Sequence, residues 1–144
     1  MMPPRLEMGA TEFIRWHEWQ GTRDLAAFLA TPAAIAFQQE YHWEEVRRRC
    51  RALALETRQR VNALTGLGPI CPSGPEWLGQ MVTVRLPEGN AEAFGRRLGE
   101  ESHIEVPVFE WNGQTFLRAS IQGYNSPEDA DALVGALAHM LAHG

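Results

Sequence analysis

The feature that most constrains the fold is a single apolar stripe between residues 43 and 64. In "HWEEVRRRCRALALETRQRVNALTG", small or apolar side chains recur every three or four residues. They are Trp43, Val46, Cys50, Leu53, Thr57, Val61 and Leu64. This is the spacing of one face of an α-helix. Glu44 and Glu45 suit its positive end, and Gly66 is a suitable stop. The stripe therefore predicts one long helix that buries one side.

A run of arginines, Arg47 to Arg51, lies on the same helix and raises the alternative of a nucleic-acid contact. Glu40, Glu44 and Glu45 lie within one or two turns of the run, at spacings that allow ion pairs. The chain has a net charge of -5 and a pI of about 5.5. We interpret the run as a solvated helix face and expect no nucleic-acid partner.

The chain before this helix is predicted to hold a strand and a further helical stretch. Residues 12–19, "EFIRWHEW", indicate a short strand, followed by a turn at Gly21 and Thr22. Asp24 is a favourable N-cap for the Ala-rich stretch that follows. Because proline lacks the amide hydrogen that an interior helical residue donates, we predict a break before Pro32 and a new helix beginning there.

After residue 79 the periodicity changes, and five elements are expected in the order strand, helix, strand, strand, helix. Their sequences are "QMVTVRLP", "NAEAFGRRLGEE", "IEVPVFEW", "QTFLRASIQ" and "SPEDADALVGALAHMLAHG". Asn90 and Ser126 are suitable caps of the two helices, and Asn112-Gly113 is a strong hairpin signal. This order predicts an α+β fold: a small sheet with helices packed on one face, preceded by the long helical segment.

These patterns divide the chain into four segments. They are residues 1–23 with the strand and the Gly-Thr turn, a helical segment 24–66, a Gly/Pro-rich loop 67–79 and an α+β domain 80–144. No apolar stretch approaches the roughly 18 residues of a membrane span, so we expect no membrane partner. The start of the chain shows no signal peptide. We expect a cytoplasmic protein whose cysteines are reduced.

The composition removes one class of chemistry from the chain. The combined count of lysine and arginine is 13, and all of these residues are arginines, so the sequence contains no lysine. A side-chain amine that could form a Schiff base with a carbonyl cofactor is therefore missing. His139 and His143 have a helical spacing that suits a metal, but no third ligand lies near them in sequence. We expect no metal site.

Arg118 is the most suggestive polar residue because it interrupts an apolar strand. Phe116, Arg118 and Ser120 are expected on one face of that strand. A half-buried guanidinium needs an anionic partner. One interpretation pairs Arg118 with Glu105 or Glu110 on the neighbouring strand. The other makes it a bidentate clamp for a substrate carboxylate. Taken alone, these residues leave both open and favour the ion pair.

Three stretches carry a resemblance to a known family. Taken in this order and at this separation, "WQGTRDLAAFLATPAAIAFQ", "HIEVPVFEWNGQTFLRASIQGYN" and "EDADALVGAL" resemble the C-terminal part of the class V aminotransferase family. These are fold-type I enzymes that depend on pyridoxal 5'-phosphate (PLP), and the resemblance is to the isopenicillin N epimerase-like members. It extends from about Phe13 to Leu141. It implies the C-terminal domain of such an enzyme, transferase or isomerase chemistry, and a dimer.

The resemblance implies roles for three residues. The family's Gly-Thr pair, matched by Gly21 and Thr22, reaches across the dimer interface and helps to hold the PLP phosphate in the other subunit's active site. The family's strand arginine, matched by Arg118, is similar to the one that binds the substrate α-carboxylate, which favours the clamp. The PLP lysine, the aspartate facing the pyridine nitrogen and the stacked aromatic ring belong to the family's large domain. We therefore expect no catalytic residue in this chain.

Two hypotheses follow. In the first, the chain is the C-terminal portion of a PLP-dependent epimerase or aminotransferase-type enzyme and is inactive alone. It binds the cofactor phosphate and an amino-acid substrate, and a large domain or partner chain supplies the lysine in a homo- or hetero-oligomer. In the second, the chain is a non-catalytic interaction or regulatory module. An independent small-ligand domain has only the element order in its favour. Desulfuration is not expected, because Val106 to Leu117 lacks the cysteine that cysteine desulfurase relatives carry there.

Overall fold

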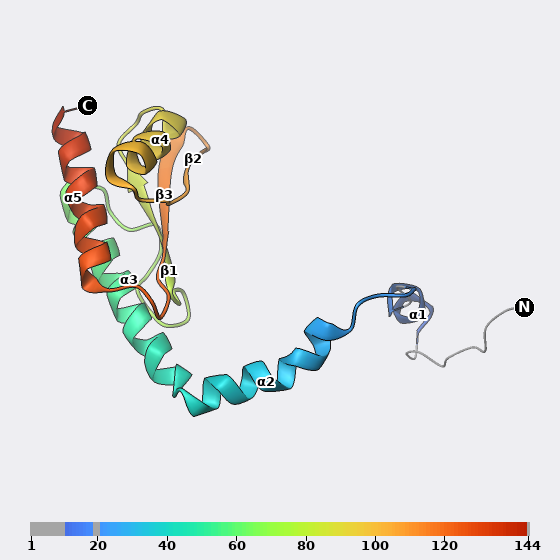
Figure 1. Ribbon diagram of the computed structural model, residues 1–144. Helices are drawn as coiled ribbons and strands as arrows, with labels where there is room; N and C mark the ends of the chain where they lie inside the picture. The colour runs from blue at the N-terminus through green and yellow to red at the C-terminus, as the bar shows by residue number, and fades with distance from the viewer. Residues whose placement is uncertain (1–10, 19–20, 144) are drawn as a thin grey trace, which may run out of the picture. The chain divides into compact units, whose positions relative to one another are not determined.

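The computed structural model describes residues 11–18 and 21–143 of the chain. These residues belong to two compact units, Met1–Tyr41 and His42–Gly144. The first unit holds α1 (Glu12–Glu18) and α2 (Ala26–Glu40). The second holds α3 (Trp43–Thr65), β1 (Met81–Leu86), α4 (Ala91–Ser102), β2 (Val108–Trp111), β3 (Gln114–Ser120) and α5 (Pro127–His143) (Figure 1). The predicted α+β order is confirmed.

The three strands form one antiparallel sheet in the order β1-β3-β2. β2 and β3 are joined by the predicted hairpin turn, in which Asn112 has φ 50° and Gly113 has φ 70°. Two consecutive positive φ values match the right-handed twist of the strands, and glycine accepts the second without steric cost. β3 is therefore the central strand, paired along both edges.

The helices of the second unit lie on one face of this sheet, as predicted (Figure 1). α3 packs against β1 and α5, while α4 packs against β2 and α5. The strand side chains that point toward these helices are buried; in β1 and β3 they include Val82, Val84, Leu86, Leu117 and Ala119. Burial of this apolar surface is the main source of stability for the unit. The helices of this unit leave the other face of the sheet uncovered.

α3 confirms the helix predicted from the apolar stripe. It begins at Trp43 and ends at Thr65, where Gly66 takes the left-handed conformation with φ 70°. Cys50, Thr57 and Val61 from the stripe are buried against the sheet and α5. The helix therefore stops at the glycine that the sequence predicted as its end.

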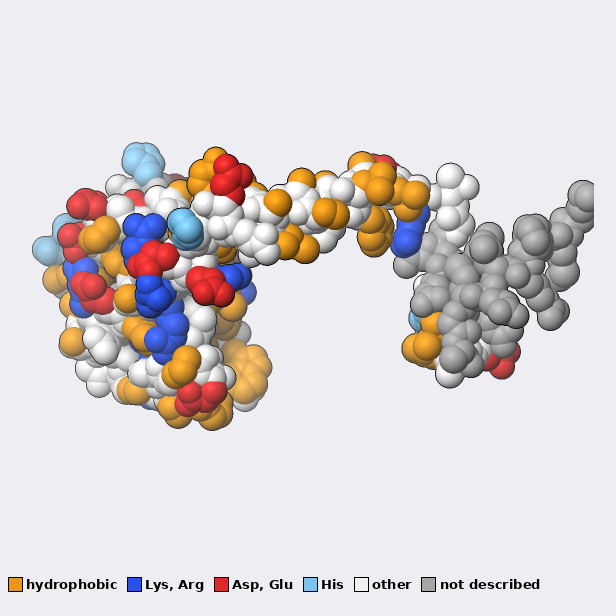
Figure 2. Space-filling view, turned by 90° about the horizontal axis from the view of Figure 1, so that it is seen from below, with side chains coloured by type: hydrophobic (Ala, Val, Ile, Leu, Met, Phe, Trp, Pro, Cys, Tyr) orange, Lys and Arg blue, Asp and Glu red, His pale blue; other side chains and the backbone are white. Residues whose placement is uncertain are grey.

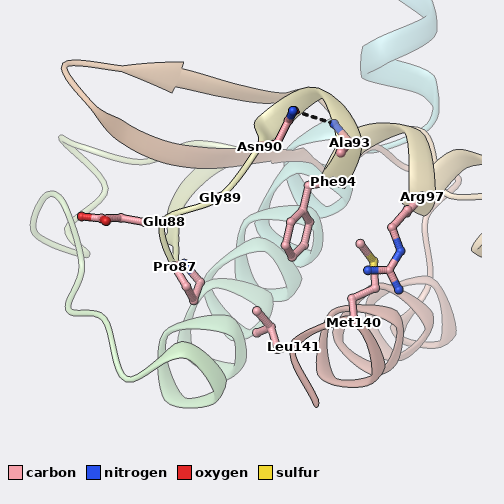
Figure 3. Close-up of a pocket in the computed structure, with 9 residues that line it drawn as sticks. All are labelled: Pro87, Glu88, Gly89, Asn90, Ala93, Phe94, Arg97, Met140 and Leu141. Carbon is pink, nitrogen blue, oxygen red and sulfur yellow. Dashed lines mark hydrogen bonds between the residues drawn. The ribbon is translucent and has the colours of Figure 1, made fainter. Parts of the chain in front are cut away.

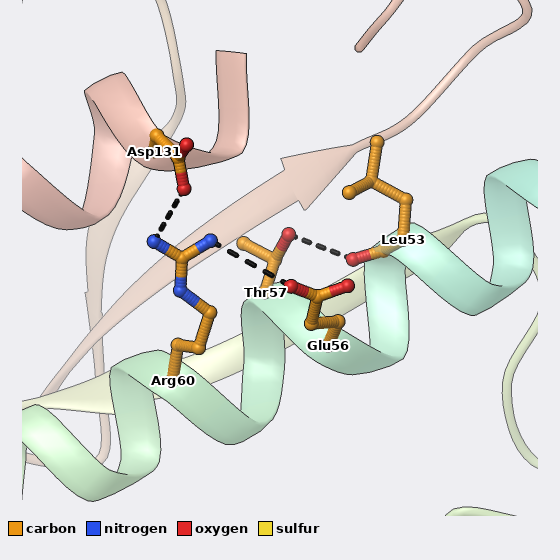
Figure 4. Close-up of polar contacts among 5 residues, drawn as sticks. All are labelled: Leu53, Glu56, Thr57, Arg60 and Asp131. Carbon is orange, nitrogen blue, oxygen red and sulfur yellow. Dashed lines mark hydrogen bonds and ion pairs between the residues drawn. The ribbon is translucent and has the colours of Figure 1, made fainter. Parts of the chain in front are cut away.

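An ion-pair cluster joins α3 to α5 (Figure 4). Nη2 of Arg60 lies 2.6 Å from Oδ1 of Asp131 on α5, and Nη1 lies 3.8 Å from Oε1 of Glu56 on α3. Thr57 donates its hydroxyl hydrogen to the carbonyl of Leu53, one turn earlier, over 2.8 Å. Both carboxylates are largely exposed, so the cluster adds little to stability, but it helps to fix the register of the two helices.

The start of α5 is held by hydrogen bonds to a carboxylate. The backbone amide of Ser126 donates to Oδ2 of Asp129 over 3.0 Å, and the side-chain amide of Asn125 donates to the same oxygen over 3.2 Å. These two bonds hold the pKa of Asp129 below its usual value, and the backbone bond from Ser126 has the larger effect. Asp129 thus accepts the backbone hydrogen bond that the third helical residue accepts in a capping box.

Three arginines fix the loop between α3 and β1, which has little regular structure. Arg51 donates to the carbonyls of Leu78 and Ser73 over 3.0 and 2.8 Å. Arg85 donates to the carbonyl of Gly68 over 2.9 Å. Arg58 completes the set by donating to the carbonyls of Cys71 and Pro72. These bonds give the loop the partners that a sheet ladder would otherwise supply.

The arginine run of α3 therefore has two environments. Arg47, Arg48 and Arg49 are exposed, as the solvated face requires, and Arg48 forms an ion pair with Glu45. Arg51 instead turns toward the loop. The prediction of a solvated face is confirmed for the first three arginines only.

The strand predicted over residues 12–19 is wrong, because residues 12–18 form helix α1; residue 19 lies outside the described residues. Two local contacts favour the helix. The hydroxyl of Thr11 accepts a hydrogen bond from the amide of Ile14 over 3.2 Å, as an N-cap does. The rings of Phe13 and His17 stack with centroids 4.0 Å apart, a contact available at this spacing in a helix but not in a strand.

The break predicted at Pro32 is also wrong. α2 runs from Ala26 to Glu40 with Pro32 inside it. Proline removes one helical amide hydrogen, and the many alanines around it have the highest helix propensity, so the remaining bonds carry the helix through. None of the described helices is both long enough and apolar enough to cross a membrane.

Candidate functional site

The face of the sheet opposite the helices carries Arg118, one of the three site residues that the sequence singled out. Residues directly opposite each other in an antiparallel pair point to the same side. The register therefore places nine side chains on this face, which we call the open face: Met81, Thr83, Arg85, Phe109, Trp111, Gln114, Phe116, Arg118 and Ser120.

Arg118 lies on the central strand of the open face. It is opposite Thr83 on β1, and on the other side its backbone amide donates to the carbonyl of Pro107 over 3.0 Å. Its Cα is therefore held from both sides, while its side chain is exposed. A guanidinium so placed can offer two parallel N–H donors to a carboxylate from solvent.

The ion pair considered for Arg118 is not found in the described part of the chain. Arg48, Arg60 and Arg97 form ion pairs there, and no such pair is found for Arg118 among the described residues. Glu110 is opposite Thr115, three residues from Arg118, and so points to the other side of the sheet. The charge of Arg118 remains available to a ligand.

The sequence placed Phe116 on the face of Arg118 but did not single out its two neighbours in the row, Arg85 and Phe109. Phe116 lies between Arg85 on β1 and Phe109 on β2. The Phe109 and Phe116 rings stack with centroids 5.7 Å apart. On the β1 side, the Arg85 side chain reaches the Gly68 carbonyl, and its Nε is buried without a hydrogen-bond partner among the described residues. Strand alternation could have revealed this row, but only once the pairing register was known.

Gly21 and Thr22 lie in the first unit, ahead of α2. Gly21 has φ 67°, a conformation that side-chain-bearing residues rarely adopt, and a Cβ there would meet no atom within 4 Å. Thr22 is exposed. The amide of Ala26 at the start of α2 already donates to Oδ1 of Asp24 over 2.8 Å. An anion at this turn would therefore meet the backbone of Gly21 and the hydroxyl of Thr22.

The predicted site residues fall in different units. Gly21 and Thr22 belong to the first unit, and Arg118 belongs to the second. Trp19 and Gln20, which precede the Gly-Thr pair, lie outside the described residues.

The two histidines considered for a metal pack on each other. Their ring centroids are 4.5 Å apart, and Nδ1 of His143 lies 2.9 Å from the carbonyl of His139. Across residues 11–18 and 21–143, no three side chains of metal-ligating type come together. Cys50 is buried and Cys71 is half-buried, and both are free thiols.

A shallow cavity of about 280 Å³ lies on the side of the sheet that carries the helices (Figure 3). Phe94 on α4 points toward Leu141 and Met140 on α5, and Pro87 and Ala93 add to its apolar lining. The charge of Arg97 is engaged by Glu101 over 3.0 Å. Glu88 points away from it (Figure 3). The cavity thus lies between α4, α5 and the loop that precedes α4, and none of its lining residues belongs to the open face.

Comparison with known proteins finds relatives among bacterial epimerases. No family model matches the chain. It is 39% identical over 134 residues to isopenicillin N epimerase from Amycolatopsis lactamdurans, covering 92% of this chain and 34% of that protein. It is 38% identical over 138 residues to isopenicillin N epimerase from Streptomyces clavuligerus, covering 94% of this chain and 35% of that protein. The chain spans about a third of the length of these relatives.

The fold is similar to part of a solved enzyme. The structure of the cysteine desulfurase CsdA from Escherichia coli matches with a TM-score of 0.65 and 20% identity, over 88% of this chain and 33% of that chain. This likeness shows the fold. The two epimerase matches, at 38–39% identity and over 92–94% of this chain, agree with its resemblance to the isopenicillin N epimerase-like members of the PLP-dependent class V aminotransferase family.

Proposed function

We propose that this chain contributes the substrate-carboxylate and cofactor-phosphate contacts of a PLP-dependent enzyme that acts at the α-carbon of an amino acid, by epimerisation or related chemistry. The observation that carries the proposal is Arg118, which is exposed on the central strand with no carboxylate partner among the described residues. The sequence similarity to two isopenicillin N epimerases supports it.

Arg118 would bind the α-carboxylate and orient the α-carbon. A guanidinium binds a carboxylate through two parallel hydrogen bonds, which fix its plane as well as its position. Because β3 is paired on both edges, the Cα of Arg118 is held in place. Positioning of this kind lowers the barrier of the chemical step by removing unproductive orientations of the substrate.

Gly21 and Thr22 would hold the phosphate of PLP. The space around Gly21 leaves its backbone accessible, and the exposed hydroxyl of Thr22 can donate a hydrogen bond. PLP, when bound, withdraws electrons from the substrate α-carbon. The residues of this chain fit its phosphate, but the chain has no lysine to bind its aldehyde carbon. We therefore propose that a large domain or a partner chain supplies the lysine.

α2 is the surface proposed to meet that domain or chain. Its exposed large apolar side chains are Phe28, Leu29, Ile35 and Phe37. No described residue of α2 is buried. Hydrophobic side chains also gather along α2 in the space-filling view (Figure 2). A helix that is apolar on all sides is typical of a buried element. Contact through α2 would place the chain in a homo- or hetero-oligomer.

Recombining the chain with a lysine-bearing large domain tests the proposal. The large domain of the Amycolatopsis lactamdurans epimerase is co-expressed with this chain, and loss of the substrate α-proton to deuterium is followed by proton NMR in D2O. We expect exchange from the combination and none from the chain alone. Thr22→Val should weaken PLP binding, since it removes a hydroxyl donor and keeps the side-chain shape.

Three results would count against the proposal. Exchange by the chain alone would show that the lysine is not needed. If Thr22→Val leaves both the PLP affinity and the exchange rate of the combination unchanged, Thr22 does not hold the phosphate. No exchange by a combination that forms a stable complex would favour a non-catalytic interaction module.

A further inference from the structure

The surface beside Arg118 is aromatic on one side only. Phe116 is 6% exposed and forms the base of this surface. The Phe109 ring that stacks on it is 39% exposed. Trp111, in the next row, is 65% exposed. We call Phe109, Trp111 and Phe116 the aromatic strip. It runs from the position next to Arg118 toward the hairpin turn.

The other side of this row is occupied. Opposite Phe116 on β1, Arg85 extends to the carbonyl of Gly68 at the start of the loop. A group bound beside Arg118 and turned toward β1 would meet this guanidinium and the loop, whereas a group turned toward β2 would meet exposed rings. Within this row, the side of Arg118 toward β2 and the aromatic strip is therefore open, whereas the side toward β1 is occupied.

Charge and shape together indicate the kind of ligand. Residues two apart in a strand lie roughly 7 Å apart, so a carboxylate on Arg118 brings the carbons attached to it over the strip. Exposed aromatic rings gain free energy when an apolar group covers them. The combination of an unpaired cation and adjacent rings complements a carboxylate with an apolar body.

We propose that the substrate is an amino acid with an apolar or aromatic side-chain portion that lies on the aromatic strip while Arg118 holds the carboxylate. Phe109 and Trp111 are then specificity-determining residues for the side chain. This inference rests on the carboxylate role of Arg118 in the proposed function and adds the class of side chain. It disfavours small polar amino acids, which would leave the strip uncovered.

An NMR titration of the chain tests the inference. The 15N-labelled chain is titrated with propionate, 3-phenylpropionate and 3-phenylpropanol at constant ionic strength. We expect both carboxylates to shift the amide signals around Arg118, and 3-phenylpropionate to bind about tenfold more tightly than propionate because its ring covers apolar surface. Phe109→Ala should remove most of this difference and leave propionate binding unchanged.

Further variants keep the test decisive. Trp111→Ala, at a position that is 65% exposed, should retain the fold and reduce the preference for 3-phenylpropionate if Phe109→Ala does not fold. Tyr124→Ala is the matched control, since Tyr124 is 85% exposed and lies after β3, outside the strip. The control should leave both carboxylate affinities unchanged.

The outcomes separate this inference from the proposed function. If propionate does not shift the signals around Arg118, the carboxylate role itself fails. If propionate binds there but the phenyl ring adds no affinity, or adds it equally in Phe109→Ala and Trp111→Ala, only the aromatic strip fails. Dimerisation of the chain that Trp111→Ala abolishes would also overturn the inference, since a second copy would then occupy the strip.

Discussion

Arg58 is the charged side chain among the buried residues that the structure describes. It is 2% exposed and makes hydrogen bonds to the carbonyls of Pro72 and Cys71. A buried guanidinium is costly unless its N–H groups are bonded. The carbonyls of a loop without a ladder need donors as well. Each group thus compensates for the burial of the other, and the loop before β1 is fixed against α3.

We predict that Arg58→Leu lowers the free energy of unfolding by about 2–4 kcal/mol, since the carbonyls of Cys71 and Pro72 lose the donor that fixes the loop. Urea denaturation measures this loss. Arg48→Leu on the same helix is the matched control, because the Arg48 side chain is 73% exposed. It should change stability by less than about 0.5 kcal/mol. Equal effects of the two substitutions would show that the loop bonds are not important.

The sequence indicated Arg118 but not Arg58, for a physical reason. Arg118 interrupts an apolar strand, so its unusual position is visible in the sequence itself. Arg58 is next to the apolar stripe of α3, and its burial depends on a loop that folds back over it. Phe109 was missed for a similar reason, since its place beside Arg118 depends on the register of β2 against β3. Contacts between distant segments decide such positions.

At the scale of elements, local chemistry set most boundaries. Gly66 ends α3, Asn90 caps α4, and the Asn112-Gly113 turn joins β2 to β3, each as predicted. Prediction failed in the first unit, where seven residues formed a helix instead of a strand and α2 continued through Pro32. A short segment with mixed polarity carries little periodicity, and one proline is outweighed by its alanine-rich neighbours.

The cap of α4 gives a prediction at this scale. Oδ1 of Asn90 accepts a hydrogen bond from the amide of Ala93 over 2.9 Å. Asn90→Ala should lower the free energy of unfolding by about 1 kcal/mol, because that amide loses its acceptor. Asn90→Ser should remain near the wild type, since serine is also a good cap. Thermal unfolding followed by circular dichroism compares them, and an equal loss in both variants would contradict the capping role.

At the scale of the whole molecule, the chain presents two surfaces that its own described residues do not cover. One is α2, whose large apolar side chains are exposed, and the other is the open face with Arg118. The chain spans about a third of the length of its epimerase relatives and has no lysine. Both facts support the proposal that a large domain or a partner chain completes the active site to which this chain contributes.

The apolar surface of α2 gives a prediction about assembly. Leu29 is 76% exposed and Ile35 is 55% exposed. Replacing both with glutamate should weaken association with the large domain at least tenfold, since burying each apolar side chain contributes about 1.5–3 kcal/mol. Analytical ultracentrifugation measures the association. Gln39→Glu on the same helix controls for added charge. Unchanged association of the double variant would exclude α2 as the contact.

The role of Arg118 is the central claim, and steady-state kinetics of α-proton exchange by the combined enzyme tests it most directly. Arg118→Gln removes the charge on the open face, while Arg96→Gln removes the same charge from an exposed position on α4. Charged hydrogen bonds contribute about 1.5–3 kcal/mol, so Arg118→Gln should lower kcat/KM about 10- to 100-fold. Arg96→Gln should have no effect. Wild-type kcat/KM in Arg118→Gln would contradict the assignment of the substrate carboxylate to Arg118.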